Sequence, residues 1–198
     1  KYIPRLSKNI NKFTRGKLLS ISGSIGFSGA CILSTNAALK SGVGIVKIIV
    51  PKSINDIIES SIAEAITIPL NDNSLGYFGL DNIDDILLHI SWANCILFGP
   101  GLNSESTSAY WMSKILKKIK IPLVLDASGF LPLIENKIKI NSLSKHTILT
   151  PHYGEFSKIF KIDKNELINR PIEVVRDIIP QLNKRVLILK GPTTLVVN

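Results

Sequence analysis

Short apolar runs that end in a glycine or a charged residue recur along this chain and restrict the folds open to it. Thr147-Ile148-Leu149 leads into Thr150-Pro151-His152-Tyr153-Gly154-Glu155, and Val186-Leu187-Ile188-Leu189 leads into Lys190-Gly191-Pro192-Thr193-Thr194. Such runs are typical of strands buried in a parallel sheet. Ligands of open α/β sheets bind beyond the carboxyl ends of these strands. The pattern predicts an α/β fold with a small-molecule or nucleotide site at 150–155 and 190–194.

Further strands are predicted at 17–21, 45–50, 93–98 and 122–125, with helices between them. Two of these strands lead into glycine-rich turns, at 22–29 and 99–102, where the backbone can approach a ligand closely. Asp126 stands at the carboxyl end of a third. The stretch from Thr67 to Leu80 is rich in turn residues, and no element is assigned to it.

Helices are predicted from their spacing and their end signals. A helix over 30–41 is expected to face the sheet with small side chains and to end at Gly42, and another is expected to begin at Ser53. Pro180 should end or kink a helix that precedes Val186. The small side chains are Ala30, Ser34, Ala37, Ala38 and Ser41.

Composition limits the classes of function. With 198 residues, 45% of them apolar, the chain can form one substantial core and is read as one domain. No apolar stretch is long enough for a membrane span, and Lys1–Arg5 lacks the apolar core of a secretory signal, so we expect a cytoplasmic protein. Cys31 and Cys95 lack the spacing of zinc ligands and are expected to be buried free thiols.

The formal charge of +9 does not point to nucleic acid. The lysines are scattered over helix faces, and no basic run is interleaved with aromatic residues. A positive field of this kind would still attract anionic substrates. A small-molecule partner is therefore expected, with neither nucleic acid nor membrane.

Each candidate site residue also has an ordinary structural explanation. Asp126 could cap the following turn, and His152 could be a simple turn histidine. Glu155 would be favoured by the dipole in the first turn of a helix, and Lys190 could be a surface lysine. Taken singly, none of these residues indicates a function.

In combination and in this order, the motifs resemble those of the NAD(P)H-hydrate dehydratase family, the ADP- or ATP-dependent repair enzymes with a ribokinase-like fold. The resemblance covers nearly the whole chain. It implies a three-layer α/β/α fold with a mostly parallel central sheet, formed by residues 1–198 as a single domain whose C-terminal part is missing. The motifs that carry it are Ser22-Gly23-Ser24 with Phe27-Ser28-Gly29-Ala30, the segment 38–46, Gly99-Pro100-Gly101-Leu102, Asp126-Ala127, the segment 149–156 and the segment 189–194.

The resemblance also implies roles for individual residues. Ala30, Gly101 and His152 would contact the hydrated nicotinamide nucleotide. Lys190, Gly191, Pro192, Thr193 and Thr194 would hold the phosphates and ribose side of ADP or ATP. Glu155 would lie near a water-bound Mg²⁺, and Asp126 would orient neighbouring groups. A lysine, a glycine with exposed N–H groups and two hydroxyls suit a phosphate.

The implied reaction dehydrates damaged, hydrated NADH or NADPH back to the normal cofactor. Because hydroxide leaves poorly, the family is thought to transfer a phosphoryl group from the nucleotide to the substrate hydroxyl and then to eliminate phosphate. A homo-oligomer is expected, and the domain is often fused behind an epimerase domain in this family.

The chain departs from the family pattern in three places. Ser128-Gly129-Phe130 follows Asp126-Ala127 where a second acid or a small residue is usual, and Tyr153 stands where proline is common. The glycine-rich segment Gly-Gly-Thr-Gly-Asp has no counterpart before Asn198. We therefore interpret the sequence as a fragment, expect the catalytic aspartate beyond Asn198, and expect the fragment alone to be nearly inactive.

Two alternatives remain open at this point. One is another ribokinase-like small-molecule kinase, against which the histidine in Thr-Pro-His-x-Gly-Glu argues. The other is a non-catalytic nucleotide-binding domain.

Overall fold

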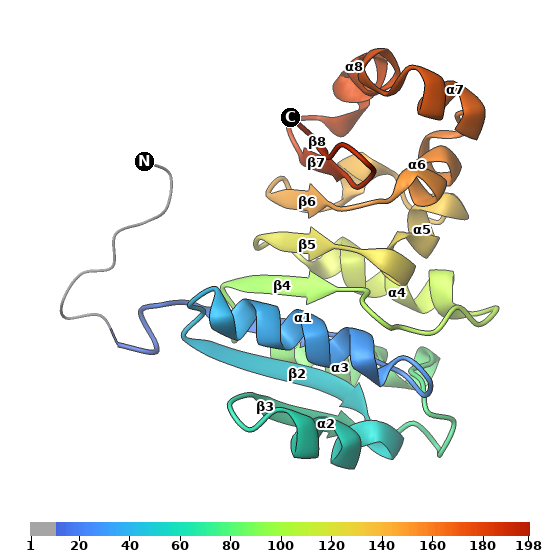
Figure 1. Cartoon of the computed structure of the whole chain (residues 1–198). Coiled ribbons are helices and arrows are strands. Elements are labelled where there is room, and N and C mark those ends of the chain that lie inside the picture. Colours follow the sequence, from blue (N-terminus) through green and yellow to red (C-terminus); the bar gives the residue numbers. More distant parts are fainter. Residues whose placement is uncertain (1–10) are drawn as a thin grey trace.

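A single sheet runs through the protein (Figure 1). The computed structural model describes residues 11–198, so Lys1–Arg5 lie outside the described part of the chain. The sheet order is β3-β2-β1-β4-β5-β6-β7-β8, and every pair is parallel except β7 with β8. The strands are β1 (Lys17–Ile21), β2 (Ile45–Pro51), β3 (Ile66–Leu70), β4 (Cys95–Phe98), β5 (Leu123–Leu125), β6 (Thr147–Leu149), β7 (Val186–Leu189) and β8 (Leu195–Val197).

Helices connect the strands and cover the sheet. The expected α/β class with a mostly parallel sheet is confirmed. The helices are α1 (Ser28–Lys40), α2 (Asn55–Ser61), α3 (Ile83–Ile90), α4 (Ser108–Lys118), α5 (Leu131–Ile134), α6 (Tyr153–Phe160), α7 (Lys164–Asn169) and α8 (Pro171–Leu182). In the part of the chain that the structure describes, none of them is long and apolar enough to cross a membrane.

Alternating side chains of the strands build two hydrophobic clusters, one on each face of the sheet. Leu19 and Phe98 belong to the larger cluster, which α3–α8 cover. Leu18 and Val46 belong to the smaller cluster under α1 and α2. The period of two residues along each strand explains this division, because successive side chains point to opposite faces.

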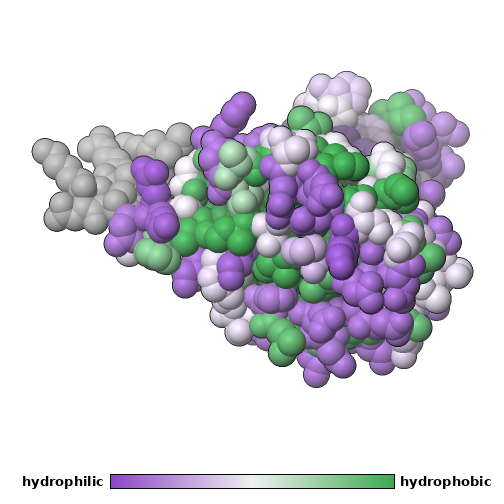
Figure 2. Space-filling model, turned by 90° about the horizontal axis from the view of Figure 1, so that it is seen from below, coloured by the Kyte–Doolittle hydropathy of each residue, from purple (hydrophilic) through white to green (hydrophobic). Residues whose placement is uncertain are grey.

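The second helical layer covers only part of its face of the sheet. In Figure 1, α1 lies in front of the β1 side of the sheet, whereas β5, β6 and β7 are open to the viewer. Val124, Ile148 and Ile188 alternate with residues of the larger cluster and are only partly buried. From below, Figure 2 shows hydrophilic and hydrophobic side chains interspersed over the surface.

Strand β3 was not predicted from the sequence, because it lies in the turn-rich stretch from Thr67 to Leu80. Its register pairs Val50 with Pro69. Proline cannot donate to a strand ladder and is tolerated on edge strands, and β3 is an edge strand of the sheet. Pro69 therefore argued against a strand in the sequence, and the structure accommodates it because β3 lies at the edge of the sheet.

Two helix predictions need correction. The buried side chains of α1 are Cys31 and Thr35, whereas Ala37 and Ser41 are exposed, so the sheet-facing stripe is not the small-residue stripe. Ser53 does not cap α2. It lies inside a 3₁₀ turn at Lys52–Ile54, and α2 follows with Ile54 at its N-cap position.

Pro180 does not end α8, although the sequence favoured an end or a kink there. The helix runs on to Leu182 and ends at Asn183, whose φ is 48°. Proline has no N–H, so the Arg176 carbonyl one turn earlier loses its usual helical donor, and the helix nevertheless continues for two more residues. The expected end of α1 is confirmed, because Gly42 follows the C-cap Ser41 with a φ of 94°.

The two cysteines are free thiols, as expected. Cys31 is fully buried and Cys95 is half-buried. Burial raises the pKa of the Cys31 thiol, and a hydrogen bond from the Ser22 hydroxyl opposes part of that rise. Burial also raises the pKa of Cys95. Both thiols are therefore poor nucleophiles.

Arg185 holds the loop before β6 to the end of α8. Its side chain is 2% exposed and donates hydrogen bonds to five carbonyl oxygens, none of them in a carboxylate. These carbonyls belong to Asn141, Leu143, Ser144, Leu182 and Asn183. Because the bonds satisfy backbone groups of both segments, Arg185 has a structural role.

Replacing Arg185 by leucine should lower the free energy of unfolding by about 3 kcal/mol or more, because several buried carbonyls lose a charged donor. Urea denaturation of Arg185→Leu measures the loss. Lys184→Gln, a change at the exposed neighbouring residue, is the matched control. Equal stabilities of the two variants would contradict the structural role of Arg185.

Candidate functional site

The carboxyl ends of β1, β4, β5, β6 and β7 meet at one edge of the sheet, because these strands are parallel. From β1 the chain runs outward to β2 and β3, and then returns to β4 on the other side of β1. The boundary between β1 and β4 is therefore the topological switch point, where open α/β sheets form a crevice for ligands.

Two predicted substrate residues meet at this switch point. The Gly23 N–H donates to the Pro100 carbonyl at 2.9 Å, and the Ser24 hydroxyl donates to the Gly101 carbonyl at 2.7 Å. A Cβ on Gly101 would lie 3.1 Å from the Cβ of Ala30 and 2.5 Å from the Phe27 carbonyl oxygen. Gly101 also has a φ of 69°. Both its conformation and its contacts therefore require glycine.

Three side chains from neighbouring strand exits meet at Asp126. The Lys190 ammonium lies 2.6 Å from Oδ1 of Asp126, and the Thr150 hydroxyl donates to the same oxygen at 2.8 Å. Asp126 follows β5, Thr150 follows β6 and Lys190 follows β7. The sequence predicted these positions but not that the three side chains bind one another.

Backbone hydrogen bonds fix the same three exits. The Thr150 N–H donates to the Leu125 carbonyl at 3.1 Å, and the Lys190 N–H donates to the Pro151 carbonyl at 2.8 Å. Lys190 and His152 form a parallel bridge beyond the ends of β6 and β7. The side chains at this edge thus project from anchored backbone.

His152 and Glu155 form a reciprocal cap at the start of α6. Nδ1 of His152 accepts hydrogen bonds from the N–H groups of Gly154 and Glu155 at 3.0 and 3.2 Å. Oε2 of Glu155 accepts from the His152 N–H at 2.9 Å. Because both partners of Nδ1 are donors, the ring proton of neutral His152 is assigned to Nε2, which lies 3.5 Å from Oε1 of Glu155.

A cavity of about 660 Å³ opens beside this cap, between α6, α7 and the segment after β7. His152, Tyr153 and Lys190 line it, together with Gly191–Thr193, Lys164, Ile168 and Pro171. A Cβ on Gly191 would lie 2.5 Å from the Tyr153 ring. The ring therefore packs directly on the glycine of the predicted phosphate segment.

A second cavity, of about 520 Å³, lies on the other side of the α6 N-terminus. Ser128, His152, Glu155 and Lys164 are among the residues that line it. His152 and Lys164 border both cavities. Lys164 and the ring of Tyr153 were missed as site residues: Tyr153 was noted only as a departure from the family pattern, and Lys164 lies on a helix that the sequence analysis did not identify.

The structure does not bring all predicted residues into contact. Ala30 and Gly101 lie at the β1 and β4 exits, whereas His152 and Lys190 lie at the β6 and β7 exits. Gly99 connects the two groups, because a Cβ on Gly99 would collide with the Asp126 carbonyl oxygen. Asp126 thus stands between the expected substrate side and the expected nucleotide side.

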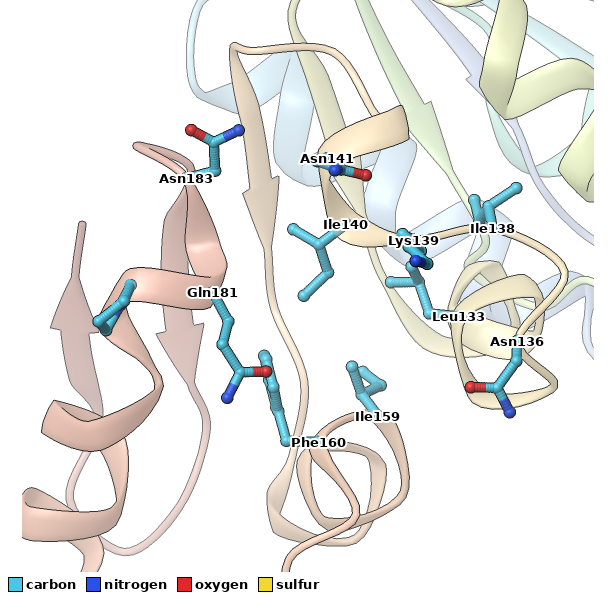
Figure 3. Close-up of a pocket in the computed structure, with 11 residues that line it drawn as sticks. Leu133, Asn136, Ile138, Lys139, Ile140, Asn141, Ile159, Phe160, Gln181 and Asn183 are labelled. Atoms are coloured by element: carbon cyan, nitrogen blue, oxygen red, sulfur yellow. The ribbon is translucent and has the colours of Figure 1, made fainter.

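A further pocket, of about 480 Å³, lies near the C-terminal ends of α5, α6 and α8 (Figure 3). Leu133, Ile140 and Phe160 supply apolar lining, and Gln181 supplies an amide. None of the residues predicted for the site lines this pocket.

A family model described as NAD(P)H-hydrate dehydratase matches residues 18–198. The chain belongs to this family. The bifunctional NAD(P)H-hydrate repair enzyme Nnr of Dictyoglomus turgidum is 32% identical over 191 residues, which make up 96% of this chain and 36% of that enzyme. This chain thus spans about a third of the length of that curated relative.

Solved structures of similar fold agree with this assignment. The ADP/ATP-dependent NAD(P)H-hydrate dehydratase of Bacillus subtilis, co-crystallised with ATP and Mg²⁺, superposes with a TM-score of 0.76 at 25% identity, over 98% of this chain and 64% of that one. A ribokinase-like superfamily protein of Enterococcus faecalis superposes with a TM-score of 0.79 at 20% identity, again over 98% and 64%. The predicted ribokinase-like fold is confirmed.

The acids at the strand exits suit a loosely held magnesium ion. Among residues 11–198, no group of three or more His, Cys, Asp or Glu side chains is arranged to hold a metal. Asp126 and Glu155 nevertheless supply two carboxylates at neighbouring exits. Magnesium keeps several waters and takes one or two carboxylates together with substrate phosphates, so this donor set fits it.

The cap at α6 gives a prediction on stability. His152→Ala removes the acceptor for two backbone N–H groups and should cost about 1 kcal/mol of the free energy of unfolding. His152→Asn should recover most of that loss, since asparagine is a strong N-cap residue. Urea denaturation of both variants measures the difference. If alanine were as stable as asparagine, the cap would contribute nothing.

Proposed function

We propose that this protein uses ADP or ATP to dehydrate the hydrated forms of NADH and NADPH, and so restores the reduced cofactor. One observation carries the proposal. His152 and Lys190 are bridged across the exits of β6 and β7 and border one cavity of about 660 Å³. A lysine and a histidine beside a cavity of this size suit a reaction between a phosphate donor and a second nucleotide. Membership of the family supports the choice of substrate.

The nucleotide phosphates would bind along Lys190, Gly191, Pro192, Thr193 and Thr194. These residues form the connection between β7 and β8, which Leu189 and Leu195 close by strand pairing. The Lys190 ammonium has three donors, and Asp126 occupies one of them. The other two can donate to phosphate oxygens, and Lys164 adds a second positive charge at the same cavity. The Bacillus subtilis dehydratase was co-crystallised with ATP and Mg²⁺, which supports the choice of a nucleotide as one of the two ligands.

The hydrated nicotinamide nucleotide would bind between the switch point and His152. Ala30 and Gly101 offer a small-residue surface where a ring can approach the backbone. The Nε2–H of His152 is the donor that remains for a substrate oxygen, because Nδ1 is engaged by α6 and the Glu155 carboxylate oxygen nearest to Nε2 is 3.5 Å away. Asp126 separates the two ligand regions and is placed to orient groups from both.

For this reaction the protein must align the two nucleotides and neutralise the charge of the transferred phosphoryl group. The terminal phosphoryl group would pass to the substrate hydroxyl, which gives up its proton. The C–O bond would then break, with phosphate carrying the oxygen away, and loss of a proton from the neighbouring ring carbon would restore the double bond. Such a transfer depends on positioned donors and cations more than on covalent help from the protein. Asp126 and Glu155 would hold Mg²⁺ through water, and the ion would neutralise phosphate charge when bound.

The remaining proposals concern location and partners. We propose a cytoplasmic location, which the two free thiols support, since oxidising compartments favour disulfides. Assembly as a homo-oligomer and fusion to an epimerase domain stay predictions. The word "bifunctional" in the name of the Dictyoglomus relative is compatible with the second of these.

The nucleotide assignment is tested by Lys190→Ala. Loss of the ammonium should weaken ATP binding about tenfold to a hundredfold, as expected for a charge-assisted contact. Calorimetric titration with ATP and Mg²⁺ measures it, with Lys118→Ala as a control on an exposed helix face. Unchanged ATP affinity in Lys190→Ala would show that the nucleotide phosphates do not bind to this segment.

The substrate assignment is tested by turnover of His152→Asn. Because this variant keeps the cap of α6, a fall in kcat/KM for the hydrate reports on the ring and not on folding. We expect a loss of about tenfold, the value of one hydrogen bond to substrate. Recovery of nicotinamide absorbance with ATP and Mg²⁺ follows the rate. Wild-type turnover by His152→Asn would leave the histidine a purely structural cap.

A further inference from the structure

We propose that Thr150 and Asp126 form a clamp that holds the Lys190 ammonium in position for nucleotide phosphates. The inference rests on the proposed function, since it names how that site is prepared. Thr150 lies in the Thr-Pro-His motif but had no role assigned to it. It is a positioning residue that acts through Asp126 and need not touch either ligand.

The geometry of the clamp is asymmetric. Thr150 and Lys190 both donate to Oδ1 of Asp126, at 2.8 and 2.6 Å. In residues 11–198, no hydrogen bond reaches Oδ2 of the same carboxylate. The Thr150 hydroxyl also lies 3.2 Å from the Leu125 carbonyl, but its single proton favours the shorter bond to the charged oxygen. Thr150 therefore fixes the plane of the carboxylate on which Lys190 rests.

Asp126 and Thr150 are held rigidly, whereas the Lys190 side chain is flexible. Asp126 is held by its N–H, which donates to the Phe98 carbonyl at 3.1 Å, and by its carbonyl, which accepts from the Gly129 N–H at 3.0 Å. Thr150 is β-branched, which restricts its χ1 angle. Lys190 has four rotatable side-chain bonds and is 45% exposed. Without a fixed partner its ammonium would sample many positions, and ordering it would oppose ligand binding.

Stability alone does not explain the arrangement. The side chains of the ion pair are 45% and 26% exposed. Pairs as exposed as this contribute little to folding, because water and salt screen them. A lysine held by an acid at the mouth of the 660 Å³ cavity gains its value when a phosphate arrives, since two of its donors are then already in place.

The first test compares threonines at the two ends of β6. Thr150→Val keeps the shape and removes the hydroxyl, and it should weaken ATP binding about fivefold, the effect of one hydrogen bond to a charged group. Thr150→Ser should stay within about twofold of the original protein because the donor remains. Thr147→Val is the matched control: its hydroxyl donates to the Ser144 carbonyl at 2.7 Å at the far end of the strand. It should lower the melting temperature without changing ATP affinity.

The second test asks whether Thr150 acts through Lys190. Calorimetry with ATP and Mg²⁺ on Lys190→Ala and on Lys190→Ala with Thr150→Val should give the same affinity, because no ammonium is left to position. Asp126→Asn removes the partner of the ammonium itself and should weaken binding more than Thr150→Val does, and adding Thr150→Val to Asp126→Asn should cause little further loss. If Thr150→Val fails to fold, Asp126→Asn tests the clamp in its place.

The outcomes separate this inference from the proposed function. If Lys190→Ala binds ATP normally, the nucleotide assignment itself is wrong. If Lys190→Ala weakens binding but Thr150→Val does not, or if Thr150→Val weakens it equally without Lys190, the clamp is overturned. The clamp is supported if Thr150→Val weakens ATP binding, Thr150→Ser retains it, and Thr150→Val has no further effect on affinity in the Lys190→Ala variant.

Discussion

Parallel pairing of β1 with both β2 and β4 is the constraint on which the rest of the structure depends. It places β1 inside the sheet and sends the chain outward in two directions from one central strand. Every later parallel strand must then return through a crossover, and each crossover leaves its loop at the same edge. Residues more than a hundred positions apart, such as Gly23 and Lys190, thereby reach one edge of the molecule.

Much of this arrangement could be predicted, because buried parallel strands are written as continuous apolar runs. Val186–Leu189 and Cys95–Phe98 have no polar residue to confuse the pattern. Strand β3 contains Pro69 and Thr67 and lacks such a run, so only its place at the edge explains it. The sheet-facing stripe of α1 was also mispredicted, because Cys31 and Thr35 occupy the inner face while the small residues that suggested a close contact turn partly outward.

The sequence predicted where the site residues lie along the chain but not which of their side chains bind one another. The sequence puts Asp126, Thr150 and Lys190 directly after strands, and nothing local states that β5, β6 and β7 are neighbours in that order. Their shared hydrogen bonds follow only from the sheet order. Likewise His152 does not look like a cap, since serine, threonine, aspartate and asparagine are the usual N-cap residues. The ring nitrogen takes their place, and as a result one nitrogen of the histidine is committed to α6.

The antiparallel strand β8 makes the predicted phosphate segment part of a β-hairpin. Residues 190–194 are the turn of a hairpin, and one of its two arms is a three-residue strand that pairs only with β7 within the described chain. Pairing of β7 with β8 closes this turn at both ends. Local opening of that pairing would release one end of the turn, so a ligand that needs the closed turn would stabilise the pairing of β8 with β7. Amide exchange at Val196 and Val197 would then act as a gauge of occupancy at a loop that neither residue belongs to.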